Sequence, residues 1–310
     1  MAEKIYDMII AGAGPAGITA AVYAARKKLD FVVISQDIGG QASWSGDIEN
    51  YTGWQFVTGP ELTMKFEEHM KAFNIAARIP EKIIELAAEG QGVRVSTDTG
   101  TYLAKSVIIA TGKRPRELRV PGEQEYKNRG VTYCATCDGP LFKNKTVAVI
   151  GGGNSALDAA LQLMKICPAV YLIVNGKELT GDPVMRETIQ KAANVEILYE
   201  TDVQRIRGEQ FVAHLDVATQ GKSRAFEAQG VFVEIGLNPN SDFAHQLIMN
   251  ERKEIVVDAF NRTSVPGIFA AGDVTNVPEK QIIIACGEGA KACLTAFHHI
   301  STTRFEQEWH

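Results

Sequence analysis

An apolar run, a glycine-rich turn and an alanine-rich amphipathic stretch follow one another twice along the chain. The first copy predicts a strand over 6–10, a turn over 12–17 and a helix over 18–27. The second copy places a strand and turn over 146–156 and a helix over 157–165. A buried strand that ends in such a turn at the start of a helix is the arrangement that binds a dinucleotide. Two copies predict two nucleotide-binding domains.

The small residues in these turns have separate roles. The first glycine permits the tight turn, the second lets backbone N–H groups approach a pyrophosphate, and the third small residue lets helix and strand pack closely. These positions are Gly12, Gly14 and Gly17 in the first turn, and Gly151, Gly153 and Ala156 in the second. The pyrophosphate would rest on the helix N-terminus, where free N–H groups favour an anion.

Two other apolar runs end in small residues, and one of them delivers an aspartate at its carboxyl end. The run 107–112 ends in Ala110-Thr111-Gly112, and the run 267–273 ends in Asp273. Ligands bind at the carboxyl ends of strands in such sheets, so Asp273 is a candidate ligand residue. The alternative is a helix N-cap or a turn carboxylate.

The stretches 114–122 and 236–241 combine Pro and Gly with polar residues, a composition typical of crossings between domains. They predict that the second domain is inserted into the first. The expected fold class is α/β, with two Rossmann-like three-layer dinucleotide-binding domains. The first would comprise 1–116 and 242–310, and the second 117–241.

The composition excludes several classes of protein. The 310 residues are 45% hydrophobic, enough for a buried core, and the net charge of −5 argues against binding to nucleic acid or to an acidic membrane surface. No apolar run is long enough to span a membrane, and no signal peptide is evident before the first strand. Five cysteines are too few for the disulfide framework of a secreted protein. We therefore expect a cytoplasmic protein.

The candidate chemistry lies in Cys134-Ala135-Thr136-Cys137, which Asp138 follows directly. Two cysteines with this spacing can close a small disulfide ring that opens and closes readily, which suits electron transfer. The same spacing also occurs in half of a zinc site or in an inert packed pair. None of the other three cysteines forms a second such pair, and no histidine lies at zinc-ligand spacing. The counting favours a redox disulfide without a metal.

Together these motifs resemble the low-molecular-weight thioredoxin reductase family over nearly the whole chain. The matching motifs occur in family order: Gly12-Ala13-Gly14-Pro15-Ala16-Gly17, Gly39-Gly40-Gln41, Asp47-Ile48-Glu49-Asn50-Tyr51, Ala110-Thr111-Gly112, Cys134 to Gly139, Gly151 to Ala156, Gly272-Asp273 and Lys280-Gln281-Ile282. The resemblance implies an FAD-dependent disulfide oxidoreductase that reduces thioredoxin or a thioredoxin-like protein and forms a homodimer.

The resemblance also implies which residues bind the cofactors. For FAD they are Gly12, Gly14, Pro15 and Ala16 at the pyrophosphate, Gln41, Asn50, Asp273, Gln281 and Ile282 along the ribityl chain and ring, and Ser35, Gln36, Gly40, Ile83, Ala110, Thr111, Gly112, Gly272 and Lys280 around them. For a nicotinamide nucleotide they are Gly151, Gly153, Asn154, Ser155 and Ala156. Asp37 is a further candidate for a ribose, with a solvated loop carboxylate as the alternative.

The same resemblance assigns the catalytic roles. Cys137 would be the sulfur nearer the flavin, and Cys134 would be the thiolate that attacks the partner's disulfide. Cys137 would then resolve the mixed disulfide. Asp138 would manage the proton of the departing thiol, with an N-cap of the next turn as the alternative.

The electron donor is where the chain departs from the family pattern. Members that use NADPH carry arginines after the second strand of the second domain, where the guanidinium groups clamp the extra phosphate. Here the strand runs into Val174-Asn175-Gly176-Lys177-Glu178, which contains no arginine. NADH stays a candidate, because Asn175 or Glu178 can hydrogen-bond ribose hydroxyls and the glycine turn is intact. A ferredoxin-type protein donor is the alternative.

Two further features bear on the choice of function. The turn 151–155 and the run 232–240 also resemble the NADH-linked flavoproteins that reduce a bacterial peroxiredoxin, which favours NADH over NADPH. An oxidase that passes electrons from flavin to oxygen while forming disulfides, and a non-catalytic flavoprotein that binds or senses, stay open. Retention of Asp138 and of a full second domain favours the reductase.

Overall fold

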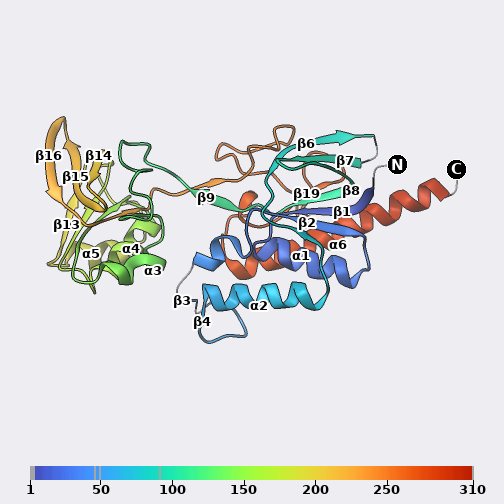
Figure 1. The fold of residues 1–310 in the computed structure, drawn as a ribbon, viewed down its shortest axis with the longest axis horizontal. Helices are drawn as coiled ribbons and strands as arrows, with labels where there is room; N and C mark the ends of the chain where they lie inside the picture. The colour runs from blue at the N-terminus through green and yellow to red at the C-terminus, as the bar shows by residue number, and fades with distance from the viewer. Residues whose placement is uncertain (1–3, 45–46, 49, 91, 309–310) are drawn as a thin grey trace. The chain divides into compact units, whose positions relative to one another are not determined.

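Each glycine turn follows a central strand of its own sheet, and that strand pairs in parallel with both of its neighbours (Figure 1). The computed structural model describes residues 4–44, 47–48, 50–90 and 92–308. The chain divides into two units, Met1–Arg114 with Asn238–His310, and Pro115–Leu237. The predicted fold class, α/β with two Rossmann-like sheets, is confirmed.

The first unit contains a seven-stranded sheet with the order β5-β2-β1-β8-β7-β6, and β19 also pairs with β8. Its strands are β1 (Ile5–Ala11), β2 (Phe31–Ile34), β5 (Ala77–Arg78), β6 (Ile83–Glu89), β7 (Gly92–Thr97), β8 (Thr101–Ile109) and β19 (Ile268–Ala270). The pairs β5–β2, β2–β1, β1–β8 and β8–β19 are parallel, whereas the β8–β7 and β7–β6 pairs are antiparallel. The carboxyl ends of β1, β2, β8 and β19 therefore meet at one edge.

Three helices lie together on one side of this sheet (Figure 1): α1 (Pro15–Arg26), α2 (Gly59–Ala72) and α6 (Ile282–Glu308). Small residues let α6 approach α1 so closely that a Cβ added at Gly289 would lie 2.0 Å from the carbonyl oxygen of Ala16. Helix α1 begins at Pro15 and not at the predicted residue 18. Proline is well suited to the first helical position, and Gly14 acts as the N-cap.

The second unit contains a five-stranded parallel sheet with the order β10-β17-β11-β12-β13 and a three-stranded antiparallel sheet, β14-β15-β16. The strands are β10 (Val131–Thr132), β11 (Thr146–Ile150), β12 (Ala169–Ile173), β13 (Val195–Leu198), β14 (Thr201–Gly208), β15 (Val212–Thr219), β16 (Lys222–Glu227) and β17 (Gly230–Val233). The helices are α3 (Ala135–Asp138), α4 (Asn154–Leu163) and α5 (Pro183–Gln190). As in the first unit, α4 begins earlier than predicted, with Gly153 as its N-cap.

The chain passes between the units along two short strands that pair with each other, β9 (Lys113–Pro115) and β18 (Leu237–Pro239). The remaining short elements are β3 (Asp47–Ile48), β4 (Val57–Thr58) and the 3-10 helices η1 (Gly40–Trp44), η2 (Gly139–Phe142) and η3 (Gly272–Val274). Within the described residues, none of the helices has the length and apolar character needed to cross a membrane.

Candidate flavin and disulfide sites

The first glycine turn is shaped by two close backbone approaches. Gly12 has φ of +110°, and a Cβ there would lie 2.4 Å from the carbonyl oxygen of Ala110. A Cβ at Gly17 would lie 1.9 Å from the carbonyl oxygen of Gly12. At Gly14, in contrast, the nearest heavy atom to an added Cβ is 3.9 Å away. The turn therefore keeps open space beside Gly14, where a pyrophosphate would approach the helix N-terminus.

The segment that follows β2 returns to this open space. The N–H of Gly39 donates to the carbonyl oxygen of Ala13 at 2.7 Å, and a Cβ at Gly40 would lie 3.5 Å from the Cα of Gly14. Asp37 accepts a hydrogen bond from the N–H of Gly40 at 3.2 Å. The structure thus brings together Gly14 and Gly40, two residues that sequence reasoning assigned to the same cofactor.

Asp273 lies beside the same helix N-terminus. It follows β19, and a Cβ at the preceding Gly272 would lie 3.0 Å from the Cβ of Ala16. Burial raises the pKa of the Asp273 carboxyl, and the charges of Lys280 and Lys113 oppose that rise. Within the described residues no hydrogen bond reaches this half-buried carboxyl. A ligand with hydroxyl groups, such as a ribityl chain, would supply the missing donors.

The other predicted flavin residues are distributed around this edge. Ser35 and Gln36 follow β2, and Ala110, Thr111 and Gly112 follow β8. The side-chain amide of Asn50 donates to the side-chain oxygen of Gln281 at 3.1 Å, which brings together two predicted flavin residues that are far apart in sequence. The next residue, Ile282, is the first residue of α6, and its side chain is half-buried.

Ile83 is placed differently from the other predicted flavin residues. It begins β6 and packs in the buried core with Ile34 and Val95. Its assignment to the cofactor stays a prediction. The structure instead explains Ile83 as part of the hydrophobic core.

A buried charge cluster at this edge includes two residues that sequence reasoning missed. Lys113 lies 2.8 Å from Glu254, and Lys280 lies 3.3 Å from the same carboxylate. The side chains of Lys113 and Glu254 are only 12% and 6% exposed. Gln41 donates its amide to the carbonyl oxygen of Lys113 at 3.1 Å, which links the cluster to a predicted flavin residue.

Replacing Lys113 with methionine should lower the free energy of unfolding by about 2 kcal/mol at pH 7. The loss is smaller than for a fully broken buried pair, because Lys280 remains beside Glu254. Denaturant unfolding measures it. The matched control is Lys105→Met, which removes an exposed pair with Asp7 and should cost at most about 0.5 kcal/mol.

The difference in unfolding free energy between the wild-type protein and Lys113→Met should depend on pH, and Glu254 determines how. Burial alone would raise the pKa of its carboxyl, but hydrogen bonds from Lys113 and Asn250 and the charge of Lys280 lower it from 4.5 to about 2. The folded-state pKa is thus depressed, so the stabilisation is complete above the unfolded value of 4.5 and is lost as the pH falls towards 2. The loss of unfolding free energy in Lys113→Met should therefore become smaller as the pH falls below 4.5. A deficit that stays constant there would contradict the assignment to this pair.

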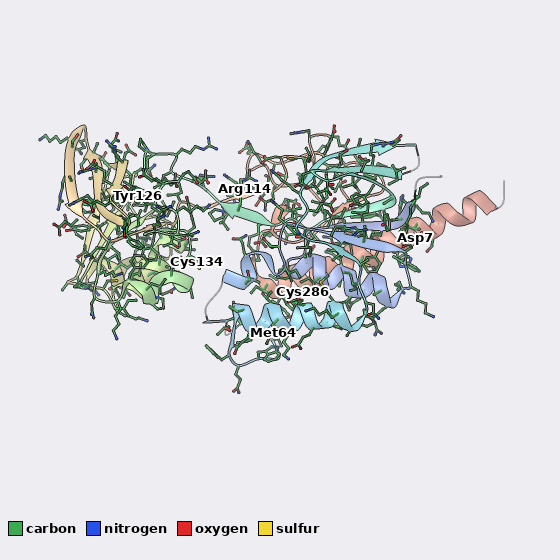
Figure 2. All side chains as sticks on the ribbon, in the orientation of Figure 1. Asp7, Met64, Arg114, Tyr126, Cys134 and Cys286 are labelled. Carbon is green, nitrogen blue, oxygen red and sulfur yellow. The ribbon has the colours of Figure 1, made fainter. Side chains whose placement is uncertain are left out.

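Cys134, labelled in Figure 2, lies directly before α3. It is disulfide-bonded, whereas Cys167, Cys286 and Cys293 are buried free thiols. The side chain of Cys137 lies outside the described part of the structure, so its pairing with Cys134 stays a prediction. The free state of the other three cysteines agrees with the expectation that they are not a second redox pair.

Asp138 is tied to Cys134 through Thr132. The N–H of Cys134 donates to the Thr132 hydroxyl at 3.2 Å, and that hydroxyl donates to the Asp138 carboxylate. The N–H of Asp138 also donates to the carbonyl oxygen of Cys134 at 3.1 Å. Asp138 precedes η2 but makes no side-chain capping hydrogen bond to it, which does not support the N-cap alternative.

Glu234 is a second acidic residue at this centre, and sequence reasoning missed it. It follows β17, and its carboxyl accepts a hydrogen bond from the N–H of Ala135. Burial raises the pKa of Glu234 to about 7, the hydrogen bond from Ala135 opposes this rise, and the charge of Asp158 adds to it. The signal in the sequence is a carboxylate that interrupts the apolar run 232–235.

The second glycine turn repeats the geometry of the first. Gly151 has φ of +137°, and a Cβ there would lie 2.3 Å from the carbonyl oxygen of Glu234. A Cβ at Gly153 would have only the Thr180 hydroxyl as a neighbour, at 3.9 Å. The turn therefore retains open space beside Gly153, with Ala156 buried beneath it and Ser155 exposed.

The segment after β12 lies beside this turn. A Cβ at Gly152 would lie 2.9 Å from Cγ1 of the buried Val174 and 3.8 Å from the carbonyl oxygen of Glu178, and the side chains of Asn175 and Glu178 are exposed. The roles of Asn175 and Glu178 towards a ribose stay predictions. Asn154 accepts a hydrogen bond from the N–H of Asp182 at 2.7 Å.

Residues 6–289 match the family described as pyridine nucleotide-disulphide oxidoreductase. The chain is 44% identical to the F subunit of alkyl hydroperoxide reductase from Pseudomonas putida over 309 residues, which cover 97% of this chain and 59% of that protein. It thus spans well under two thirds of the length of that relative. Similar solved structures include thioredoxin reductase of Lactococcus lactis, with 33% identity, a TM-score of 0.84 and coverage of 96% and 99% of the two chains. Thioredoxin reductase of T. acidophilum has 36% identity, a TM-score of 0.81 and the same coverage.

The matches extend over both units and include the glycine turns and the disulfide segment described above. The chain belongs to the pyridine nucleotide-disulphide oxidoreductases, and within them to the low-molecular-weight thioredoxin reductase family of flavin-dependent enzymes that act on disulfides.

Proposed function

We propose that this protein reduces the disulfide of thioredoxin or a thioredoxin-like protein, with electrons passing from NADH to FAD and then through a Cys134–Cys137 disulfide. The observation that carries the proposal is the disulfide-bonded Cys134, joined through Thr132 to the carboxylate of Asp138. We infer a homodimer from the family resemblance alone, and a cytoplasmic location from the composition and the number of cysteines.

The first unit fits FAD. Gly14 leaves the space that a pyrophosphate needs, and Asp273, whose carboxyl has no hydrogen bond from the residues that the structure describes, lies at the same edge of the sheet. The residues that would hold the cofactor are Gly12, Gly14, Gly40, Gln41, Asn50, Asp273 and Gln281. Bound FAD would accept two electrons from the donor and deliver them to the disulfide.

The residues of the second unit would carry out the disulfide exchange. The thiolate of Cys134 attacks the partner's disulfide, and one partner sulfur leaves as a thiolate and takes up a proton. Cys137 then attacks the mixed disulfide, which restores the protein disulfide and releases the reduced partner. Thr132 fixes the carboxyl of Asp138 near Cys134, so that Asp138 can hold the proton during this exchange.

The choice of NADH rests on the intact turn at Gly151 and Gly153 and on the lack of arginine in the segment after β12. A ferredoxin-type protein donor is the second candidate. It is favoured by Val174, which places an apolar side chain against the turn where a carboxylate usually holds the ribose hydroxyls.

Gly153→Ala tests this choice without disturbing the fold. The added methyl group meets only the Thr180 hydroxyl at 3.9 Å, and φ is −92°, which alanine adopts readily. We expect anaerobic NADH to bleach the flavin absorbance of the wild-type protein and to do so on the order of 100-fold more slowly in the variant. Dithionite should bleach both equally, which serves as the control.

Three results would change the proposal. Equal bleaching of both proteins by NADH would mean that NADH does not bind at this turn. Bleaching by neither NADH nor NADPH, with prompt bleaching by reduced ferredoxin, would establish the protein donor. Rapid oxygen consumption coupled to oxidation of the partner's thiols would indicate a dithiol oxidase.

A further inference from the structure

Glu234 and the disulfide segment meet at the carboxyl edge of the second unit's parallel sheet. Strand β17 ends at Val233, and Glu234 follows it beside the glycine turn, with its carbonyl oxygen 2.3 Å from the Cβ position of Gly151. Its carboxyl accepts a hydrogen bond from the N–H of Ala135, the residue directly after Cys134. The fold thus holds an acidic side chain one residue away from the disulfide.

Among the described residues, the one charge that acts on the Glu234 carboxyl is negative. Asp158 of α4 acts on its carboxyl, and Asp138 lies at the other end of α3. Within the described residues, no lysine or arginine is among the groups whose charge acts on Glu234. Burial, followed by the charge of Asp158, raises the pKa of Glu234 to about 7, against the hydrogen bond from Ala135. A carboxyl that only stabilised the fold would normally be paired with a cation.

We propose that Glu234 is a positioning residue that couples reduction of the Cys134 disulfide to the uptake of a proton. An ionised Glu234 disfavours a second negative charge on the sulfur of Cys134, whereas a protonated Glu234 does not. By linkage, a thiolate that forms on Cys134 draws a proton onto Glu234. The inference rests on the proposed function, because it requires that the disulfide be reduced and reoxidised in the folded protein.

The step balances as follows. A dithiol reductant is oxidised to its own disulfide, the protein S–S bond breaks, and two electrons pass to the two protein sulfurs. Two protons leave the reductant. When the sulfur of Cys134 stays a thiolate, one of these protons resides on the carboxyl of Glu234 and the other on the second sulfur.

The experiment compares the wild-type protein with Glu234→Gln in redox buffers of reduced and oxidised dithiothreitol at pH 5.5 and pH 8.5. Glutamine keeps an oxygen that can accept the hydrogen bond from Ala135 but cannot ionise. Acid quenching and alkylation then count the thiols in each sample. The count separates the closed disulfide from the three cysteines that are always free. Asp158→Asn is the matched control, because it removes an exposed carboxylate that also acts on Glu234.

We expect equal equilibrium constants at pH 5.5 and a disulfide that is about tenfold easier to reduce in Glu234→Gln at pH 8.5, which corresponds to about 30 mV. Asp158→Asn should change the constant by no more than about threefold. Even if the variant folds poorly, the equilibrium constant for disulfide reduction in the wild-type protein should itself change with pH around pH 7, where Glu234 ionises. Equal constants at both pH values, or one constant offset at both, would overturn the inference and leave the proposed function intact. A disulfide that no buffer reduces in the folded protein would overturn both.

Discussion

Cys134→Ser should lower turnover with a disulfide partner on the order of a thousandfold or more, because the sulfur that attacks the partner is lost. Flavin reduction by the electron donor should continue at its normal rate, since the flavin residues of the first unit are unchanged. Steady-state reduction of a thioredoxin, measured beside rapid-mixing bleaching of the flavin, separates the two effects.

Cys167→Ala is the matched control for this substitution. Cys167 is a buried free thiol of the same unit, which packs in the hydrophobic core and donates a hydrogen bond to the carbonyl oxygen of Phe142 at 3.3 Å. Its removal should leave turnover within about twofold. Turnover of Cys134→Ser within tenfold of the wild-type value would mean that the partner is reduced elsewhere, and that the disulfide is not on the electron path.

Gly14→Ala should weaken FAD binding on the order of 100-fold while the apoprotein stays as stable as the wild-type protein. The backbone at Gly14 has φ of −82° and ψ of −174°, which alanine tolerates, and the nearest heavy atom to its Cβ is 3.9 Å away. The methyl group would instead occupy the space that the pyrophosphate needs. FAD titration and denaturant unfolding of the apoprotein measure the two quantities.

Gly17→Ala is the contrasting variant. Its Cβ would lie 1.9 Å from the carbonyl oxygen of Gly12, so it should lose stability and FAD together. Unchanged FAD affinity in a stably folded Gly14→Ala protein would show that the pyrophosphate does not rest on this turn.

The parts of the fold that could be predicted are those determined by residues close together in sequence. The strands that precede the glycine turns and the strand that leads to Asp273 are continuous apolar runs. Each run ends in small residues, which in two cases form the glycine turn. The structure contains each of these elements. The helix starts were placed too late, because Pro15 and Asn154 look like turn residues but occupy the first helical positions.

The parts that could not be predicted depend on pairs far apart in sequence. Lys113 and Glu254 are 141 residues apart, and nothing near either residue indicates the buried ion pair that joins them. Glu234 likewise meets Ala135 only because β17 and the disulfide segment reach the same sheet edge. Val174 likewise packs against Gly152 of the second turn only because the fold brings the end of β12 to that turn, which a motif comparison does not reveal.

The most direct test of the account is an anaerobic titration of the FAD-loaded protein with dithionite, followed by acid quenching and alkylation of thiols. The chain has five cysteines, and among those whose side chains the structure describes, Cys167, Cys286 and Cys293 are free and Cys134 is disulfide-bonded. We predict that the protein takes up two electrons for the disulfide beyond those needed by the flavin, and that the alkylated thiols rise from three to five. Complete bleaching of the flavin with the count still at three would contradict it, because electrons would then reach the flavin but not the disulfide.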